Sequence, residues 1–139
     1  MPEILHQLVI EKSDARVFSA LTEQAGIRGW FTRYAEARPE VGNVNRMIFA
    51  GQVIFEMRVD ALDPNDRVLW TCLSGHPEWE GTTIEFTLAE APAPRGATLV
   101  RFAHRGWKSA DGVLAQCSYD WAQYLRSLKL FFEKRKGTP

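Results

Sequence analysis

"CSYDWAQYLRSLKLFFEKRKGTP", residues 117–139, is the stretch that decides the fold. Its apolar residues recur at spacings of three and four, which is typical of a helix that turns one stripe toward a core. With one residue from just upstream, the stripe consists of Leu114, Cys117, Trp121, Leu125, Leu128 and Phe132. We expect a single helix over residues 112–136, roughly 35 Å long at 1.5 Å per residue. An aromatic stripe of this length requires an extended apolar partner.

The partner is predicted in the middle of the chain, where the hydrophobic period changes from about 3.6 to two. Val53, Phe55, Met57 and Val59 alternate with polar residues, as in a half-buried antiparallel strand. The sequence "DPND" after this strand favours a turn, since proline fixes φ and the Asx side chains bond locally. Further strands are predicted within residues 67–74, 81–90 and 97–107.

The N-terminal part is predicted to contribute one strand and two short helices. Residues 3–12 are rich in aliphatic and β-branched side chains, which favours an opening strand. Ser13 and Asp14 are good N-cap types, and Val17, Phe18 and Leu21 follow at helical spacing. A second short helix or an irregular turn is expected over residues 23–32, which contain two glycines.

Length and composition bound the function classes. The 139 residues are 45% hydrophobic, which fits one domain over residues 1–139. Seventeen basic and seventeen acidic residues cancel, and no basic stripe interleaves with aromatics, so we expect no nucleic-acid partner. Cys72 and Cys117 lack metal or redox spacing and are interpreted as core residues. No apolar run reaches membrane-span length, which favours a cytoplasmic protein that does not enter a membrane.

These elements predict an α+β protein in which a curved antiparallel sheet wraps around the C-terminal helix. The sheet must cover its apolar face, and the terminal helix is the element with matching length and hydrophobicity. Because twisted sheets curve, they need not close tightly along the whole helix, and space left at one end forms a cavity. Some aromatic residues of the helix are therefore expected to line a pocket.

Three patches resemble a known family. They are "VFSALTEQAGIRGWF" at residues 17–31, "VDALDPNDRVLWTC" at residues 59–72 and "WAQYLRSLKLFFEKRKGTP" at residues 121–139. In this order they resemble the START-like SRPBCC superfamily, and within it the domain related to the C-terminal part of the heat-shock-protein-90 ATPase activator. The resemblance implies the helix-grip fold, with a deep and mostly apolar cavity between sheet and helix. One departure is Asp120-Trp121, where members often carry Gly-Trp.

His104 is the best single polar candidate for the site. Strand parity places it with Val100 and Phe102, facing the helix, where a neutral imidazole can orient a ligand. The competing interpretation is a core histidine with satisfied hydrogen bonds. Glu78 and Glu80 flank Trp79 in a connecting loop, where they are interpreted as solubilising charges. The full set of candidate ligand-binding residues is Trp30, Phe55, Met57, Trp70, Trp79, Phe86, Phe102, His104, Trp121, Tyr124 and Leu125.

The sequence favours a protein that binds a small hydrophobic or aromatic molecule. No catalytic residue, cofactor or metal site is predicted, because His6, His76 and His104 lack ligand spacing and no nucleophile motif is present. Two alternatives stay open: an enzyme of the cyclase, aromatase or hydrolase sort that uses the same cavity, and a chaperone-associated interaction module. A homodimer is the other protein assembly that the sequence leaves open.

Overall fold

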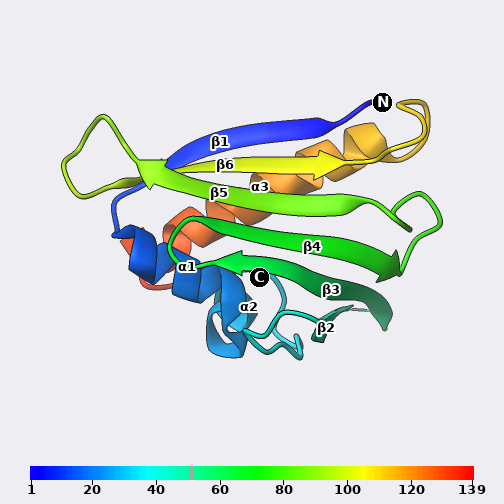
Figure 1. The fold of residues 1–139 in the computed structure, drawn as a ribbon, viewed down its shortest axis with the longest axis horizontal. Helices are drawn as coiled ribbons and strands as arrows, with labels where there is room; N and C mark the ends of the chain where they lie inside the picture. Colours follow the sequence, from blue (N-terminus) through cyan, green and yellow to red (C-terminus); the bar gives the residue numbers. More distant parts are fainter. Residues whose placement is uncertain (51) are drawn as a thin grey trace.

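The computed structural model describes residues 1–50 and 52–139. It contains a six-stranded antiparallel sheet and three helices, which confirms the predicted α+β class (Figure 1). The elements in chain order are β1 (Ile4–Ile10), α1 (Asp14–Thr22), α2 (Gln24–Trp30), β2 (Val44–Phe49), β3 (Val53–Asp63), β4 (Arg67–Ser74), β5 (Thr83–Glu90), β6 (Thr98–Arg105) and α3 (Leu114–Glu133).

The order of strands across the sheet is β1-β6-β5-β4-β3-β2, so the first strand closes one edge beside the last. In Figure 1, α3 crosses behind the sheet, while α1 and α2 lie at one end of it. One face of the sheet thus covers the terminal helix. This arrangement is the helix-grip fold that the sequence predicted.

Strand alternation decides which side chains meet the helix. In β5, Ile84, Phe86 and Leu88 are buried, and in β6 the buried positions include Phe102 and His104. These are the inward positions that period-two patterning predicted. The core is therefore built from alternate residues of the strands, packed against α3 and the two short helices.

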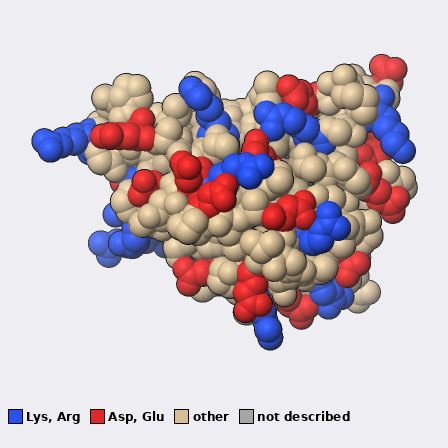
Figure 2. Space-filling view, in the orientation of Figure 1, with Lys and Arg blue, Asp and Glu red and all other residues tan. Residues whose placement is uncertain are grey.

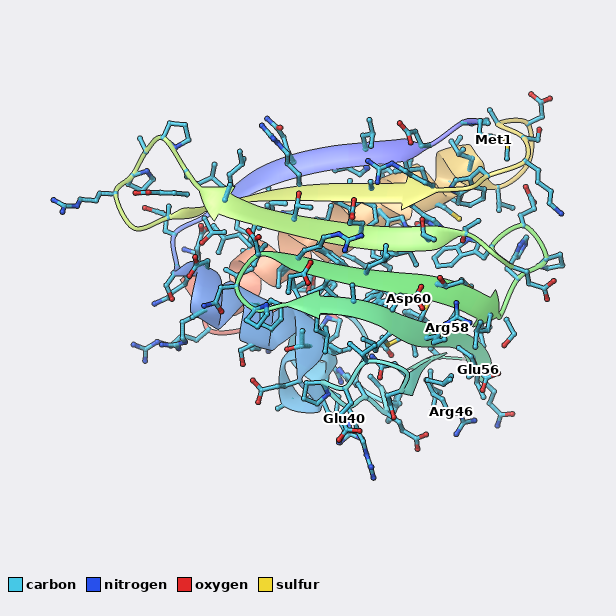
Figure 3. All side chains as sticks on the ribbon, in the orientation of Figure 1. Met1, Glu40, Arg46, Glu56, Arg58 and Asp60 are labelled. Atoms are coloured by element: carbon cyan, nitrogen blue, oxygen red, sulfur yellow. The ribbon has the colours of Figure 1, made fainter. Side chains whose placement is uncertain are left out.

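The opposite face of the sheet carries paired charges. Glu85 accepts hydrogen bonds from Arg67 Nε at 2.6 Å and from Arg105 Nη1 at 2.9 Å, which joins three neighbouring strands at their centre and ends. Charges of both signs are interspersed over the face seen in Figure 2. Glu56, Arg58 and Asp60 follow one another along β3 in Figure 3, with Arg58 and Asp60 paired at 2.7 Å. This face has the mixed charge of a solvated surface.

The terminal helix is shorter than predicted, with α3 spanning Leu114–Glu133 instead of residues 112–136. At its start, Val113 is the N-cap residue and has no capping side chain of its own. At its end, Arg135 adopts a positive φ of 56°, which ends the helical path. The basic residues 134–136 consequently lie just beyond the helix.

The two short helices follow the predicted start signal. Ser13 caps α1, and its Oγ accepts a hydrogen bond from the Arg16 backbone N–H at 3.3 Å. Trp30 closes α2 and donates from Nε1 to the Ala20 carbonyl at 2.8 Å, which ties the two helices together. At Gly26 a Cβ would lie 2.5 Å from the Ala20 Cα, so this close approach requires glycine.

Within residues 1–50 and 52–139, no helix has the length and apolar character needed to cross a membrane.

Candidate ligand-binding cavity

A cavity of about 260 Å³ lies between the sheet and α3, at one end of the helix; this end is called the open end of the grip. The first half of α3 forms one side, and the ends of α2, β2 and β3 together with the β4–β5 connection, residues 75–82, form the others. The lining residues are Phe31, Phe49, Phe55, His76, Trp79, Val113, Gln116, Cys117, Asp120, Trp121 and Tyr124. Six of these are aromatic, so the wall is mainly ring surface.

The rings of the wall pack on one another in defined geometries. Phe31 stacks on Trp121 with centroids 5.3 Å apart and an interplanar angle of 12°. Tyr124 meets Phe31 edge to face at 4.9 Å, and Phe55 packs against Trp79 at 4.5 Å. Such contacts are favourable in themselves and hold the rings in place around the cavity. The wall is therefore largely pre-formed.

The β4–β5 connection is tied to the start of α3. The Glu78 carboxylate accepts from the Val113 backbone N–H at 3.2 Å, so a side chain 35 positions away satisfies a free helix donor. Trp79 Nε1 donates to Cys117 Sγ at 3.3 Å. Gly75 turns this connection with a φ of +136°, and a Cβ there would lie 2.4 Å from the Phe55 ring. These contacts place Trp79 over the cavity.

Glu78 therefore has a structural role that the sequence reading did not assign to it. From the sequence alone, charges that flank a loop tryptophan are expected only to keep it soluble. The structure places this carboxylate at the positive end of a helix, where negative charge is favourable. It fixes the connection that carries Trp79, and so it helps to shape one wall of the cavity.

His104 lies outside the cavity, fully buried behind Trp79 and Trp121. Its Nδ1 accepts from Trp121 Nε1 at 3.1 Å. Because an indole N–H can only donate, the proton of the neutral imidazole resides on Nε2, which donates to Thr82 Oγ1 at 2.8 Å. The Thr82 hydroxyl donates in turn to the Trp79 carbonyl. Both ring nitrogens are thus occupied by a hydrogen-bonded chain within the protein.

We expect this network to make stability depend on pH. Burial lowers the pKa of His104 from 6.5 to about 3, so between these values the unfolded chain binds a proton that the folded chain excludes. Stability is then fully present above pH 6.5 and falls as the pH drops, by about 1.4 kcal/mol per unit for one proton. Urea unfolding at pH 7 and pH 5 should show a decrease of about 2 kcal/mol from this residue.

The carboxylate Glu85 should not contribute to this decrease between pH 7 and pH 5. Burial raises the pKa of Glu85, but hydrogen bonds from Arg67 and Arg105 outweigh it and hold the pKa below its usual 4.5, so its contribution is lost only at lower pH. The His104→Phe variant should lack the decrease between pH 7 and pH 5. Equal decreases of stability in the variant and the wild type would show that His104 does not cause the pH dependence.

The structure brings four of the predicted residues together in the cavity wall: Phe55, Trp79, Trp121 and Tyr124. The other seven lie in the packed core and do not line this cavity. They are Trp30, Met57, Trp70, Phe86, Phe102, His104 and Leu125. Phe86, for example, is enclosed by Trp30, Trp70 and Phe102 at the centre of the sheet. Only residues near the open end of the grip reach the cavity.

Sequence reasoning missed several lining residues. Phe31 follows the last residue of α2, and Phe49 ends β2, where neither periodicity gives a face. Gln116 and Asp120 lie one turn apart on α3, and the Gln116 amide donates to Asp120 Oδ1 at 3.0 Å. Their spacing of four is a usable signal, because it places both side chains beside the aromatic stripe.

Two groups of the wall have raised pKa values. Burial raises the pKa of the Cys117 thiol, and the negative charges of Asp120 and Glu78 add to this despite the hydrogen bond from Trp79. Burial also raises the pKa of the Tyr124 hydroxyl, again with a contribution from Asp120. Both side chains are therefore neutral at physiological pH. In the part of the chain that the structure describes, no three His, Cys, Asp or Glu residues gather into a metal-binding group.

A curved antiparallel sheet closed over a long C-terminal helix defines the START-like helix-grip class of proteins. Within it the chain belongs to the family of Activator of Hsp90 ATPase homolog 1-like proteins, which residues 12–133 match. No match to a curated protein was found.

Solved structures show the same fold. The chain is similar to the Aha1 dimer from Colwellia psychrerythraea, a solution structure, with 32% identity over 96% of this chain and 97% of that one and a TM-score of 0.85. It is also similar to protein MLL2253 from Mesorhizobium loti, at 18% identity, 96% and 98% coverage and a TM-score of 0.82. CalU16 from Micromonospora echinospora has 18% identity, 99% and 77% coverage and a TM-score of 0.75.

Proposed function

We propose that this protein binds a small hydrophobic or aromatic molecule in the cavity at the open end of the grip. The observation that carries the proposal is the cavity itself, about 260 Å³ of space with six aromatic side chains in its wall. Aromatic rings supply large apolar contact area at fixed positions, which suits a pre-formed ligand pocket. The family and its fold agree with this use, since the helix-grip architecture leaves space between sheet and helix.

The position of His104 favours a binding function over a catalytic one. A general acid or base must lie within hydrogen-bond reach of the group on which it acts. His104 is fully buried, lies outside the cavity wall and has both ring nitrogens bonded to Thr82 and Trp121. Its depressed pKa of about 3 also keeps the imidazole neutral. The polar groups that do border the cavity are suited to orienting a ligand.

Native mass spectrometry of protein purified from its own host should detect a retained small molecule. The matched test is to close the cavity from its rim with Gln116→Trp, because Gln116 is exposed on α3 and lines the cavity. This variant should lose the additional mass. Trp79 and Trp121 border the cavity, so bound and free protein should also differ in tryptophan emission.

The control is Gln123→Trp, a substitution of the same kind at an exposed position of α3 that does not line the cavity. It should retain the molecule as the wild type does. Retention by both variants would place the ligand elsewhere. Wild-type protein that carries no additional mass would contradict constitutive binding.

The family match carries a second candidate, a protein-interaction role. The family description names a homolog of an Hsp90 ATPase activator, and the 32% identical relative is described as a dimer. These descriptions support a chaperone partner and a homodimer for this chain as well. A pull-down against the host's Hsp90 tests the first, and sedimentation velocity over a range of protein concentrations tests the second.

A further inference from the structure

The chemistry of the ligand can be narrowed from the polar groups at the cavity. Among the described lining residues there is no Lys or Arg, and Asp120 is the one carboxylate. Its Oδ1 accepts from the Gln116 amide, and no described salt bridge pairs it with a cation. Asp120 is half-buried beside Trp121, so its charge is partly shielded from water. The cavity thus has an acidic and hydrogen-bond-accepting border.

The negative charge of Asp120 acts on the interior of the cavity. It contributes, after burial, to raising the pKa of both Cys117 and Tyr124, which line the wall on either side of Trp121. The Glu78 carboxylate adds to this effect at Cys117. Because the described wall contains no Lys or Arg to pair with it, a carboxylate or phosphate on a ligand would be repelled by the Asp120 carboxylate.

We propose that the ligand is an organic ammonium compound, with its ring body enclosed by the aromatic wall and its cationic nitrogen at Asp120. This proposal rests on the proposed binding function. A cationic N–H group would give the Asp120 carboxylate a charge-assisted hydrogen bond, which is stronger than a bond between neutral groups. Aromatic rings are also favourable neighbours for an ammonium group, because ring faces attract cations.

The volume limits the size of the ring body. A water molecule occupies about 30 Å³ in the liquid, so a cavity of about 260 Å³ equals the space of roughly nine waters. This volume is slightly below the usual range for ligand pockets, which starts at about 300 Å³. One ring or two fused rings therefore fit, while the charged group remains at the border formed by Gln116 and Asp120.

Three probes that share one ring system test the charge preference. They are 1-naphthylmethylammonium, 1-naphthylmethanol and 1-naphthoate, which carry a cationic, a neutral and an anionic group. Isothermal titration calorimetry at pH 7.5 should show the tightest binding for the ammonium compound and the weakest binding for the naphthoate. Asp120→Asn keeps the size of the side chain and should weaken ammonium binding roughly tenfold, as expected for loss of a charge-assisted bond. It should leave naphthylmethanol binding nearly unchanged.

Asp66→Asn is the matched control, because Asp66 lies in the β3–β4 turn at the end of β4 opposite the β4–β5 connection. It should bind all three probes as the wild type does. Equal or tighter binding of the neutral or anionic probe overturns the ammonium proposal while the binding function stands. An unchanged ammonium affinity in Asp120→Asn also overturns it. Failure of all three probes to bind overturns the cavity function and this inference with it.

Discussion

Replacing Trp121 by Ala should lower the free energy of unfolding by about 3 to 5 kcal/mol, the range found when a large buried aromatic side chain is truncated. Trp121 is 2% exposed. Its ring contacts Phe31 at a centroid distance of 5.3 Å and Phe102 at 4.5 Å. The substitution removes these contacts between helix and sheet, and it leaves His104 Nδ1 without its donor. Chemical denaturation followed by circular dichroism measures the change.

Tyr119→Ala is the control on the same helix. Tyr119 is 62% exposed, so its truncation should change stability by no more than about 0.5 kcal/mol. The two variants introduce the same residue two positions apart, which cancels the helix propensity of alanine. If the loss for Trp121→Ala matched that of Tyr119→Ala, the sheet would not hold the helix at this residue.

The second large effect is expected for His104→Phe, which should destabilise the fold by about 2 to 4 kcal/mol at pH 7. The substitution strands the buried Trp121 N–H, at a cost of about 1 to 3 kcal/mol, and removes the hydrogen bond to Thr82, worth about 1 kcal/mol. Ligand affinity should not change, because His104 does not line the cavity. Thermal and chemical unfolding give the stability, and a titration gives the affinity.

A double-mutant cycle with Trp121→Phe separates the hydrogen bond from the shape of the ring. In that background the indole N–H is already absent, so His104→Phe should cost less by at least about 1 kcal/mol. The same cost in both backgrounds would mean that the Trp121–His104 bond does not contribute to stability. A weakened affinity with unchanged stability would instead support direct contact between His104 and the ligand.

The fold could be predicted because the strand period of two and the helix period of about 3.6 occur in separate parts of the chain. Strand parity placed His104 beside Phe102 on the inward face, and the structure confirms both as buried. The stripe containing Trp121 and Leu125 likewise identified the gripped face of α3. Local alternation reports which face of an element a residue occupies, and this information is enough to define the layers of the domain.

The cavity could be predicted only in part, because parity does not report how far a residue lies from the open end of the grip. Phe55 and Phe86 occupy equivalent inward faces, yet Phe55 borders the cavity and Phe86 is enclosed in the core. Phe31 and Phe49 reach the wall from the ends of elements that meet only in the folded chain. The bond between Glu78 and Val113 joins positions 35 residues apart, so no local pattern signals it.

That same bond makes the backbone amide at the start of α3 a reporter of ligand entry. If Trp79 swings outward to admit a molecule, the Glu78 carboxylate moves with the loop and the Val113 amide loses its acceptor. The amide proton would then exchange with deuterated solvent at a rate set by loop opening, while a bound guest that holds the loop closed would slow this exchange. The exchange rate of the Val113 amide therefore measures how often the loop opens, with no dye or tag attached to the protein or the ligand.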